Sequence, residues 1–125
     1  MEYKKLPKNV RAIRLLRVFS SPDRDELIRS TLELRKLESP GVYRALSYVW
    51  GDPQDTGSIY INDVEVAVTK TVVSALKHLR PRASKSALVI WIYAVCINQK
   101  DHHEKNQQVP LMSDIYTKGT EVSAG

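Results

Sequence analysis

No stretch of this 125-residue chain constrains its fold more than positions 87–92, which read Ala-Leu-Val-Ile-Trp-Ile. The run is short, rich in β-branched and aromatic residues and free of polar alternation, as is typical of a strand buried on both faces. It leads through the amide pair Asn98-Gln99 to the pattern D-x-x-E formed by Asp101 and Glu104. This pattern predicts a helix N-terminus at which Asp101 caps the Glu104 amide and Glu104 reaches back. Because open α/β sheets bind ligands beyond the carboxyl ends of their strands, we expect any site to lie here.

Three other segments have strand-like patterns. Residues 13–19 and 43–50 are largely apolar, whereas residues 28–34 alternate between apolar and polar side chains. The alternating segment also fits a helix template that runs through Leu27 and Leu34, so both interpretations of it stay open.

A β-hairpin followed by a helix is predicted between residues 59 and 81. Two alternating runs, 59–61 and 64–68, flank Asn62-Asp63, and both of these turn residues tolerate a positive φ. Thr69 is placed to cap the helix, and Pro81 is placed to end it. The buried stripe of this helix is expected to comprise Val72, Val73, Leu76 and Leu79.

A second helix should begin after Asp101. Pro110 falls inside it, and because proline removes one N–H and clashes with a preceding carbonyl, we expect a kink that costs about 3 kcal/mol or more. Gly119 is a plausible C-cap, after which only a few residues remain. The buried stripe of the helix is expected to comprise Val109, Met112, Ile115 and Tyr116.

The composition is that of one soluble globular domain, with 42% hydrophobic and 26% charged residues. We expect residues 1–42 to supply lead-in strands that pack as one unit with an α/β domain over residues 43–125. Cys96 is the only cysteine, which excludes an internal disulfide and a cysteine-based zinc site. The N-terminus lacks the apolar core of a signal peptide, and no apolar run could span a membrane. These features favour a cytoplasmic location.

The net charge of +5 raises the question of nucleic-acid binding. Lysine and arginine are scattered along the chain, however, and the densest basic stretch, residues 77–85, contains no aromatic residue. The pattern therefore favours a solvated loop over a nucleic-acid site.

Several segments, in the right order, match one known family. Residues 43–53, which read Tyr-Arg-Ala-Leu-Ser-Tyr-Val-Trp-Gly-Asp-Pro, resemble the signature of the fungal heterokaryon-incompatibility (HET) domain. Residues 91–99 resemble its central motif, and residues 104–116 resemble the helix that follows. The hairpin at 59–68, the helix at 74–80 and the strand at 13–16 resemble the remaining elements. Three separated motifs make this resemblance specific.

The resemblance implies an α/β fold related to Toll/interleukin-1 receptor (TIR) domains. We therefore expect a TIR-like or flavodoxin-like open sheet with an inserted β-hairpin, incomplete at its C-terminus. The family implies a fungal signalling module of non-self recognition, a form of innate immunity that ends in programmed cell death. Its implied partners are a second copy of the chain or other incompatibility and NLR-type proteins, with no membrane.

Glu104 is the catalytic candidate that the resemblance implies. Some TIR relatives cleave NAD with a glutamate on the helix after a central strand, and Glu104 occupies the corresponding place. NAD would then be a substrate, with no cofactor and no metal required. The alternative reading of Glu104 is a helix-capping residue, and this step rests on analogy between folds.

Two groups of residues are the candidates for binding a ligand. After the central strand these are Asn98, Gln99 and Gln108, although Asn98 and Gln99 could equally satisfy loose backbone groups. The second group ends the strand at 43–50, where a core tryptophan and a tight turn are the alternative reading. It comprises Ser47, Trp50, Gly51 and Asp52.

Two observations weigh against catalysis. Tyr93 stands where the family usually carries aspartate, which exchanges an anion for a neutral phenol. The expected truncation would remove later elements of the domain.

Cys96 could be a nucleophile with His102 or His103 as its base, but a lone cysteine after a buried strand is more often a small core residue. The alternative function is a non-catalytic, self-associating interaction module or an inactive relative.

Overall fold

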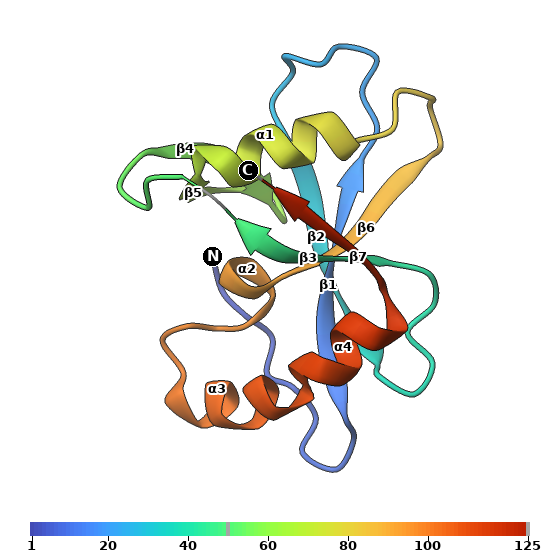
Figure 1. Ribbon diagram of the computed structural model, residues 1–125, viewed down its shortest axis with the longest axis vertical. Helices are drawn as coiled ribbons and strands as arrows, with labels where there is room; N and C mark the ends of the chain where they lie inside the picture. Colours follow the sequence, from blue (N-terminus) through green and yellow to red (C-terminus); the bar gives the residue numbers. More distant parts are fainter. Residues whose placement is uncertain (50, 125) are drawn as a thin grey trace.

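Seven strands form one sheet in the computed structural model, which describes residues 1–49 and 51–124 (Figure 1). The strands are β1 (Ala12–Phe19), β2 (Arg29–Lys36), β3 (Arg44–Val49), β4 (Thr56–Ile61), β5 (Val64–Thr69), β6 (Ala87–Ile92) and β7 (Thr120–Ala124). The helices are α1 (Lys70–Leu79), α2 (Tyr93–Cys96), α3 (His102–Gln108) and α4 (Met112–Lys118), with a 3₁₀ turn, η1 (Val109–Leu111), between the last two.

The strand order is β5-β4-β2-β1-β6-β3-β7, and the sheet is mixed. β1 is antiparallel to both of its neighbours, β2 and β6, whereas β6, β3 and β7 run parallel to one another. The β4–β5 hairpin joins the sheet through the parallel pairing of β4 with β2. The α/β class is therefore confirmed, whereas the TIR-like or flavodoxin-like topology is not.

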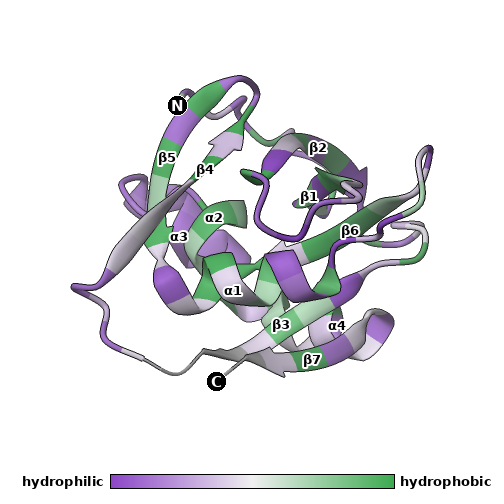
Figure 2. Cartoon of the chain, turned by 90° about the horizontal axis from the view of Figure 1, so that it is seen from above, coloured by the Kyte–Doolittle hydropathy of each residue, from purple (hydrophilic) through white to green (hydrophobic). Residues whose placement is uncertain are grey.

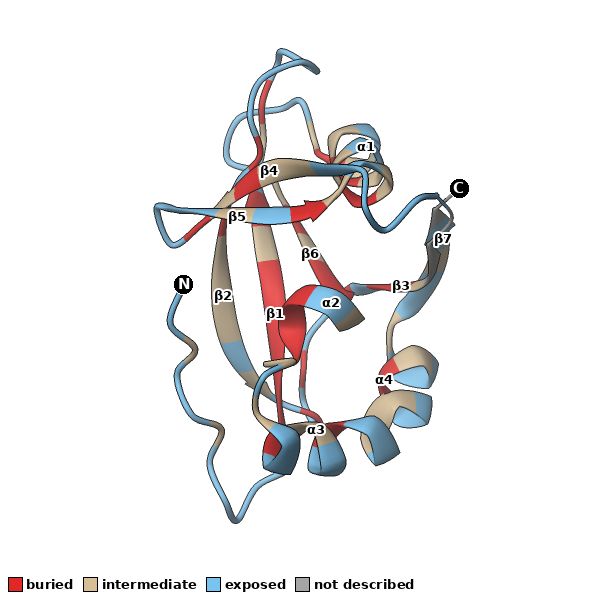
Figure 3. Cartoon of the chain, turned by 90° about the vertical axis from the view of Figure 1, so that its left-hand side faces the viewer, coloured by how far each residue is buried: buried red, intermediate tan, exposed pale blue. Residues whose placement is uncertain are grey.

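The core lies around the two central strands. Ile13, Leu15 and Leu16 of β1 are fully buried, and so are Ile90 and Trp91 of β6. Figure 2 shows β6 largely in the hydrophobic colour, and Figure 3 shows β1 buried along most of its length. Consecutive residues of both strands are buried, so both of their faces are covered, which explains why their apolar runs lack the alternation of a half-exposed strand.

The predicted hairpin and first helix are confirmed, because both are encoded by local signals. Asn62 and Asp63 have φ values of 51° and 65°, the left-handed conformation that a two-residue hairpin turn requires. The Thr69 side chain accepts a hydrogen bond from the Val72 amide at 3.3 Å, as an N-cap does. α1 ends at Leu79, one residue before its C-cap Arg80 and two before Pro81.

Three expectations for the middle of the chain need correction or completion. The segment at 28–34 is a strand, not a helix, because it pairs with β1 along most of its length. The polar loop does not follow β6 directly, because the helical turn α2 comes first. A further strand, β7, follows Gly119 and pairs in parallel with β3.

The second helix is kinked at Pro110, as expected, and splits into α3, η1 and α4. Its predicted stripe is only partly right: Ile115 is fully buried, but Val109 is 45% exposed. Glu104, Gln108 and Ile115 define the buried face, and Val109, which directly follows Gln108, lies about 100° around the helix from it. Gly119 is the C-cap of α4, and a Cβ there would lie 2.5 Å from the Tyr43 ring.

Candidate functional site

A buried ion pair between Arg14 and Glu104 joins the central strand to the helix that carries the catalytic candidate. Arg14 Nη1 donates to Glu104 Oε2 at 2.8 Å, and Nη2 donates to Oε1 at 2.6 Å. The two residues are only 2% and 7% exposed. Parallel bonds between a guanidinium and a carboxylate form the strongest common ion-pair geometry in proteins. Both Glu104 oxygens are therefore engaged within the fold.

Three elements hold the Glu104 carboxylate in place. Asp101 caps α3 by accepting from the Glu104 amide at 3.1 Å, as predicted. The reciprocal half of the predicted capping box is wrong: Glu104 turns to Arg14 and accepts the Asn98 amide at 2.7 Å instead. A buried carboxylate needs such partners because unpaired burial of its charge is costly.

The N-terminal segment closes the far side of Arg14. The Tyr3 ring lies over the guanidinium, with Arg14 Cζ 4.7 Å from the ring centroid. Tyr3 Oη donates to the Val95 carbonyl at 2.7 Å, and the Lys4 carbonyl accepts from Arg14 Nη2 at 2.8 Å. Burial raises the pKa of the Tyr3 phenol, so that it stays protonated and donates at neutral pH.

The amide side chains near Glu104 bond to backbone groups. Asn98 Oδ1 accepts the Lys100 amide at 3.2 Å, and Gln99 Nε2 donates to the Tyr93 carbonyl at 2.8 Å. Gln108 is 3% exposed, and its Nε2 donates to the Ala12 carbonyl at 2.9 Å. These contacts match the backbone-satisfying alternative for Asn98 and Gln99, while a ligand role for the three residues stays a prediction.

The described residues of the second predicted group have polar and steric contacts of their own. Ser47 Oγ donates to the Val122 carbonyl at 3.1 Å, which ties it to β7, and Asp52 Oδ1 accepts the Gln54 amide in an exposed turn. Gly51 has a φ of 113°, and a Cβ there would collide with Thr71 Oγ1 of α1. Trp50 lies outside the described residues. A ligand role for this group stays a prediction.

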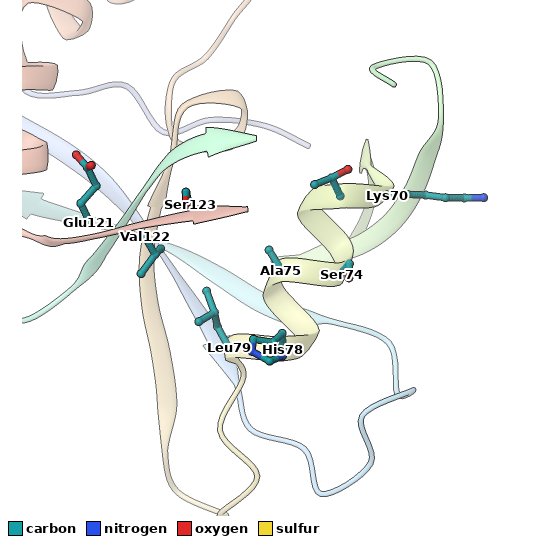
Figure 4. A pocket seen from close by; sticks show the side chains of 9 residues that line it. Lys70, Ser74, Ala75, His78, Leu79, Glu121, Val122 and Ser123 are labelled. Atoms are coloured by element: carbon teal, nitrogen blue, oxygen red, sulfur yellow. The ribbon is translucent and has the colours of Figure 1, made fainter. Parts of the chain in front are cut away.

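A cavity lies between α1 and β7, and Figure 4 shows these two elements on either side of it. Its volume is about 870 Å³, and among the described residues neither Glu104 nor the other predicted ligand-binding residues line it. The lining residues are Lys70, Thr71, Ser74, Ala75, His78, Leu79, Glu121, Val122 and Ser123. Sequence reasoning assigned α1 to the core alone, and β7, which forms the opposite wall, was not predicted.

Cys96 has the environment of a core residue. It is fully buried, its sulfur accepts the Ile92 amide at 3.4 Å, and burial raises the pKa of its thiol to about 12. Within the described part of the chain, no cluster of three or more histidine, cysteine or acidic side chains could hold a metal ion. Over the same residues, no helix is long and apolar enough to cross a membrane.

We expect Cys96 to resist alkylation in the folded protein. Treatment with iodoacetamide at about pH 8 should leave the mass of the native chain unchanged. The same treatment of the chain unfolded in urea should add the mass of one adduct. Burial raises the pKa of this thiol from its ordinary value of 9.0 to about 12, so its ionisation in the unfolded chain should lower stability as the pH rises above 9. Intact-mass measurement checks the first expectation; native alkylation at the rate of free cysteine would contradict it.

Two residues of the buried centre were not predicted as site residues. The sequence could have indicated Arg14, because a charged residue inside the apolar run Ile13-Arg14-Leu15-Leu16 needs a buried counter-charge. The sequence could not have indicated Tyr3, because no local pattern predicts that a tyrosine near residue 1 stacks on an arginine of β1.

The comparisons with known proteins agree with the motifs. A profile of the family described as "Heterokaryon incompatibility protein (HET)" matches residues 43–124, from just before β3 to the end of β7. The chain is 39% identical over 97 residues to "Heterokaryon incompatibility protein 6, OR allele" of Neurospora crassa. That alignment covers 69% of this chain but only 14% of the relative. No solved structure matches the chain significantly. The family match extends over most of the sheet and over the helix that bears Glu104, and the chain belongs to the heterokaryon incompatibility (HET) family.

Proposed function

We propose that this chain acts in fungal non-self recognition as a signalling module that works by binding. The support is its membership of the HET family and its likeness to a relative named as an incompatibility protein. The chain spans only 14% of that relative's length, so any activity and partners of the whole protein are proposed for this chain from its family membership. The partners we propose are a second copy of the chain or other incompatibility proteins.

One observation favours binding over NAD hydrolysis: both oxygens of Glu104 bond to Arg14 inside the protein. To stabilise positive charge on a ribosyl group, this carboxylate would have to leave a bidentate partner and reach a substrate from a buried position. At the position of the family aspartate, Tyr93 presents its ring to Lys105, with Nζ 5.9 Å from the centroid. Neither residue offers a free anion to a substrate.

The proposal is tested by following NAD and growth in the same cells. Inducible expression in a filamentous fungus should arrest growth and admit a vital dye while total NAD stays at the level of uninduced cells. Purified chain should likewise consume NAD no faster than buffer. Glu104→Gln, which keeps the shape of the side chain, and the exposed control Glu38→Gln should behave alike in both assays once circular dichroism has shown them to be folded.

Two outcomes would contradict this proposal. NAD consumption that is abolished in a folded Glu104→Gln variant and retained in Glu38→Gln would restore the catalytic role of Glu104. Expression without any effect on growth would remove the signalling role, whatever the NAD level.

A further inference from the structure

The N-terminal segment is attached to the fold by very few contacts. Residues 2–5, here called the N-terminal strap, belong to none of the strands or helices of the described chain. Two of its residues, Tyr3 and Lys4, hold it through the ring over Arg14, the bond to the Val95 carbonyl and the bond from Arg14 to the Lys4 carbonyl. Glu2, Lys4 and Lys5 are exposed, and Figure 3 shows the segment running along the outside of the molecule.

Two hollows lie on either side of the strap. One, of about 300 Å³, is lined by Glu2, Lys4 and Arg14 together with Leu32 and Leu34 of β2. The other, of about 230 Å³, is lined by Tyr3, by Ala94 and Val95 of α2, and by the β4–β5 hairpin. Because strap residues form part of the wall of both hollows, the strap is the partition between them.

We propose that the N-terminal strap opens while the sheet stays folded, and that opening joins the two hollows into one cleft that binds a planar aromatic ring carrying a hydrogen-bond donor. The face of the Arg14 guanidinium is the floor of this cleft, and the Val95 carbonyl is the acceptor at its far end. This cleft is distinct from the cavity between α1 and β7, and the proposal does not depend on how the chain signals.

Tyr3 itself shows which chemistry the cleft accepts. Its ring stacks on a guanidinium, an arrangement that favours aromatic groups through the attraction between a cation and a π-system. Its hydroxyl donates to a carbonyl, which sets the polarity of the far end. Glu104 already neutralises Arg14, so the floor carries little net charge and an anionic ring gains no advantage. A neutral phenol is the simplest ligand that meets these conditions.

The strap should open at a lower free energy than the sheet unfolds, since opening breaks only these contacts and leaves every strand pairing intact. Opening uncovers Arg14 and lets water compete for the Glu104 carboxylate that Arg14 holds, so exchange of the Asn98 amide, which donates to that carboxylate, reports on this event. The amides of the β1–β6 ladder around Leu16 and Ile90 report on unfolding of the sheet.

The test is amide hydrogen exchange of the full chain by NMR, comparing wild type with Tyr3→Ala. We expect Tyr3→Ala to accelerate exchange at Asn98 by about tenfold or more, the equivalent of one lost hydrogen bond and one stacking contact, and to leave the ladder amides unchanged. Tyr60→Ala is the matched control: Tyr60 also stacks on an arginine, Arg29, with Cζ 5.0 Å from the ring centroid, but far from Glu104. It should not affect Asn98.

The ligand class is tested on the same variant with p-cresol, which has the shape of the missing side chain. Saturating p-cresol should restore slow exchange at Asn98 in Tyr3→Ala, whereas toluene, which lacks the hydroxyl, should restore less. Unchanged exchange at Asn98 in Tyr3→Ala would contradict the proposal that Tyr3 holds the strap closed. Equal acceleration of the ladder amides would show that the strap unfolds together with the sheet and would contradict its separate opening. The binding of a phenol in the cleft would be contradicted if p-cresol neither slowed exchange at Asn98 nor shifted the Val95 and Cys96 resonances.

Discussion

Replacing Glu104 by alanine is expected to lower the free energy of unfolding by about 3–5 kcal/mol, because it strands the buried charge of Arg14. The same change removes the acceptor of the Asn98 amide, so the turn before α3 should loosen as well. Urea denaturation followed by circular dichroism gives the measurement, with the loss expected in the midpoint and not in the slope.

The matched control for this prediction is Glu33→Ala. Glu33 also bonds to two arginines, Arg17 and Arg35, but at the surface, where its side chain is 30% exposed. Exposed pairs of this kind contribute about 0–1 kcal/mol, so the control should lose far less. A second variant, Arg14→Met combined with Glu104→Leu, should recover much of the stability, since apolar residues of similar size can replace a buried ion pair. Equal losses for Glu104→Ala and Glu33→Ala would contradict the structural role of the pair.

Truncating Trp91 to alanine should cost about 3–5 kcal/mol, the range found for large aromatic residues in cores. Trp91 is fully buried in β6, and its ring meets Tyr116 of α4 edge to face, with centroids 5.5 Å apart and planes at 86°. The change therefore leaves a cavity between the central sheet and the last helix. Thermal unfolding followed by far-UV circular dichroism is the measurement.

Two further variants separate volume from hydrogen bonding at this position. The buried Nε1 of Trp91 has no acceptor among the described residues, so Trp91→Phe should lose volume without losing a hydrogen bond and should cost clearly less than alanine. Val42 is 93% exposed, and Val42→Ala should stay within about 0.5 kcal/mol of wild type. A Trp91→Ala variant as stable as Val42→Ala would refute the proposed packing.

The features that could be predicted from the sequence are those encoded by neighbouring residues. Asn62 and Asp63 determine the hairpin by their own conformational freedom, and Thr69 caps a helix three residues ahead of its partner amide. Pro110 interrupts its own helix. Each of these effects operates within one or two turns of backbone, where the pattern of residue types contains the necessary information.

The features that could not be predicted depend on pairings across the chain. Arg14 and Glu104 are 90 residues apart, and no local pattern states that they meet. The exposure of Val109 follows from the burial of its neighbour Gln108, which bonds to the Ala12 carbonyl 96 residues away. In the candidate site, Asn98 and Glu104 come together because the turn before α3 brings the Asn98 amide back to the first turn of that helix, whereas Ser47 and Asp52 bond to β7 and to their own turn.

The antiparallel seam between β1 and β6 has a consequence for synthesis on the ribosome. β1 is translated before β6, its partner on one side, and before Glu104, the counter-charge of Arg14, which follows 90 residues later. Until then the apolar side chains of β1 and the charge of Arg14 lack the partners that bury them. Pairings so distant in sequence carry a high entropic cost of loop closure and slow the folding of a domain. Nascent chains of this protein should therefore depend on chaperones until α3 has left the exit tunnel.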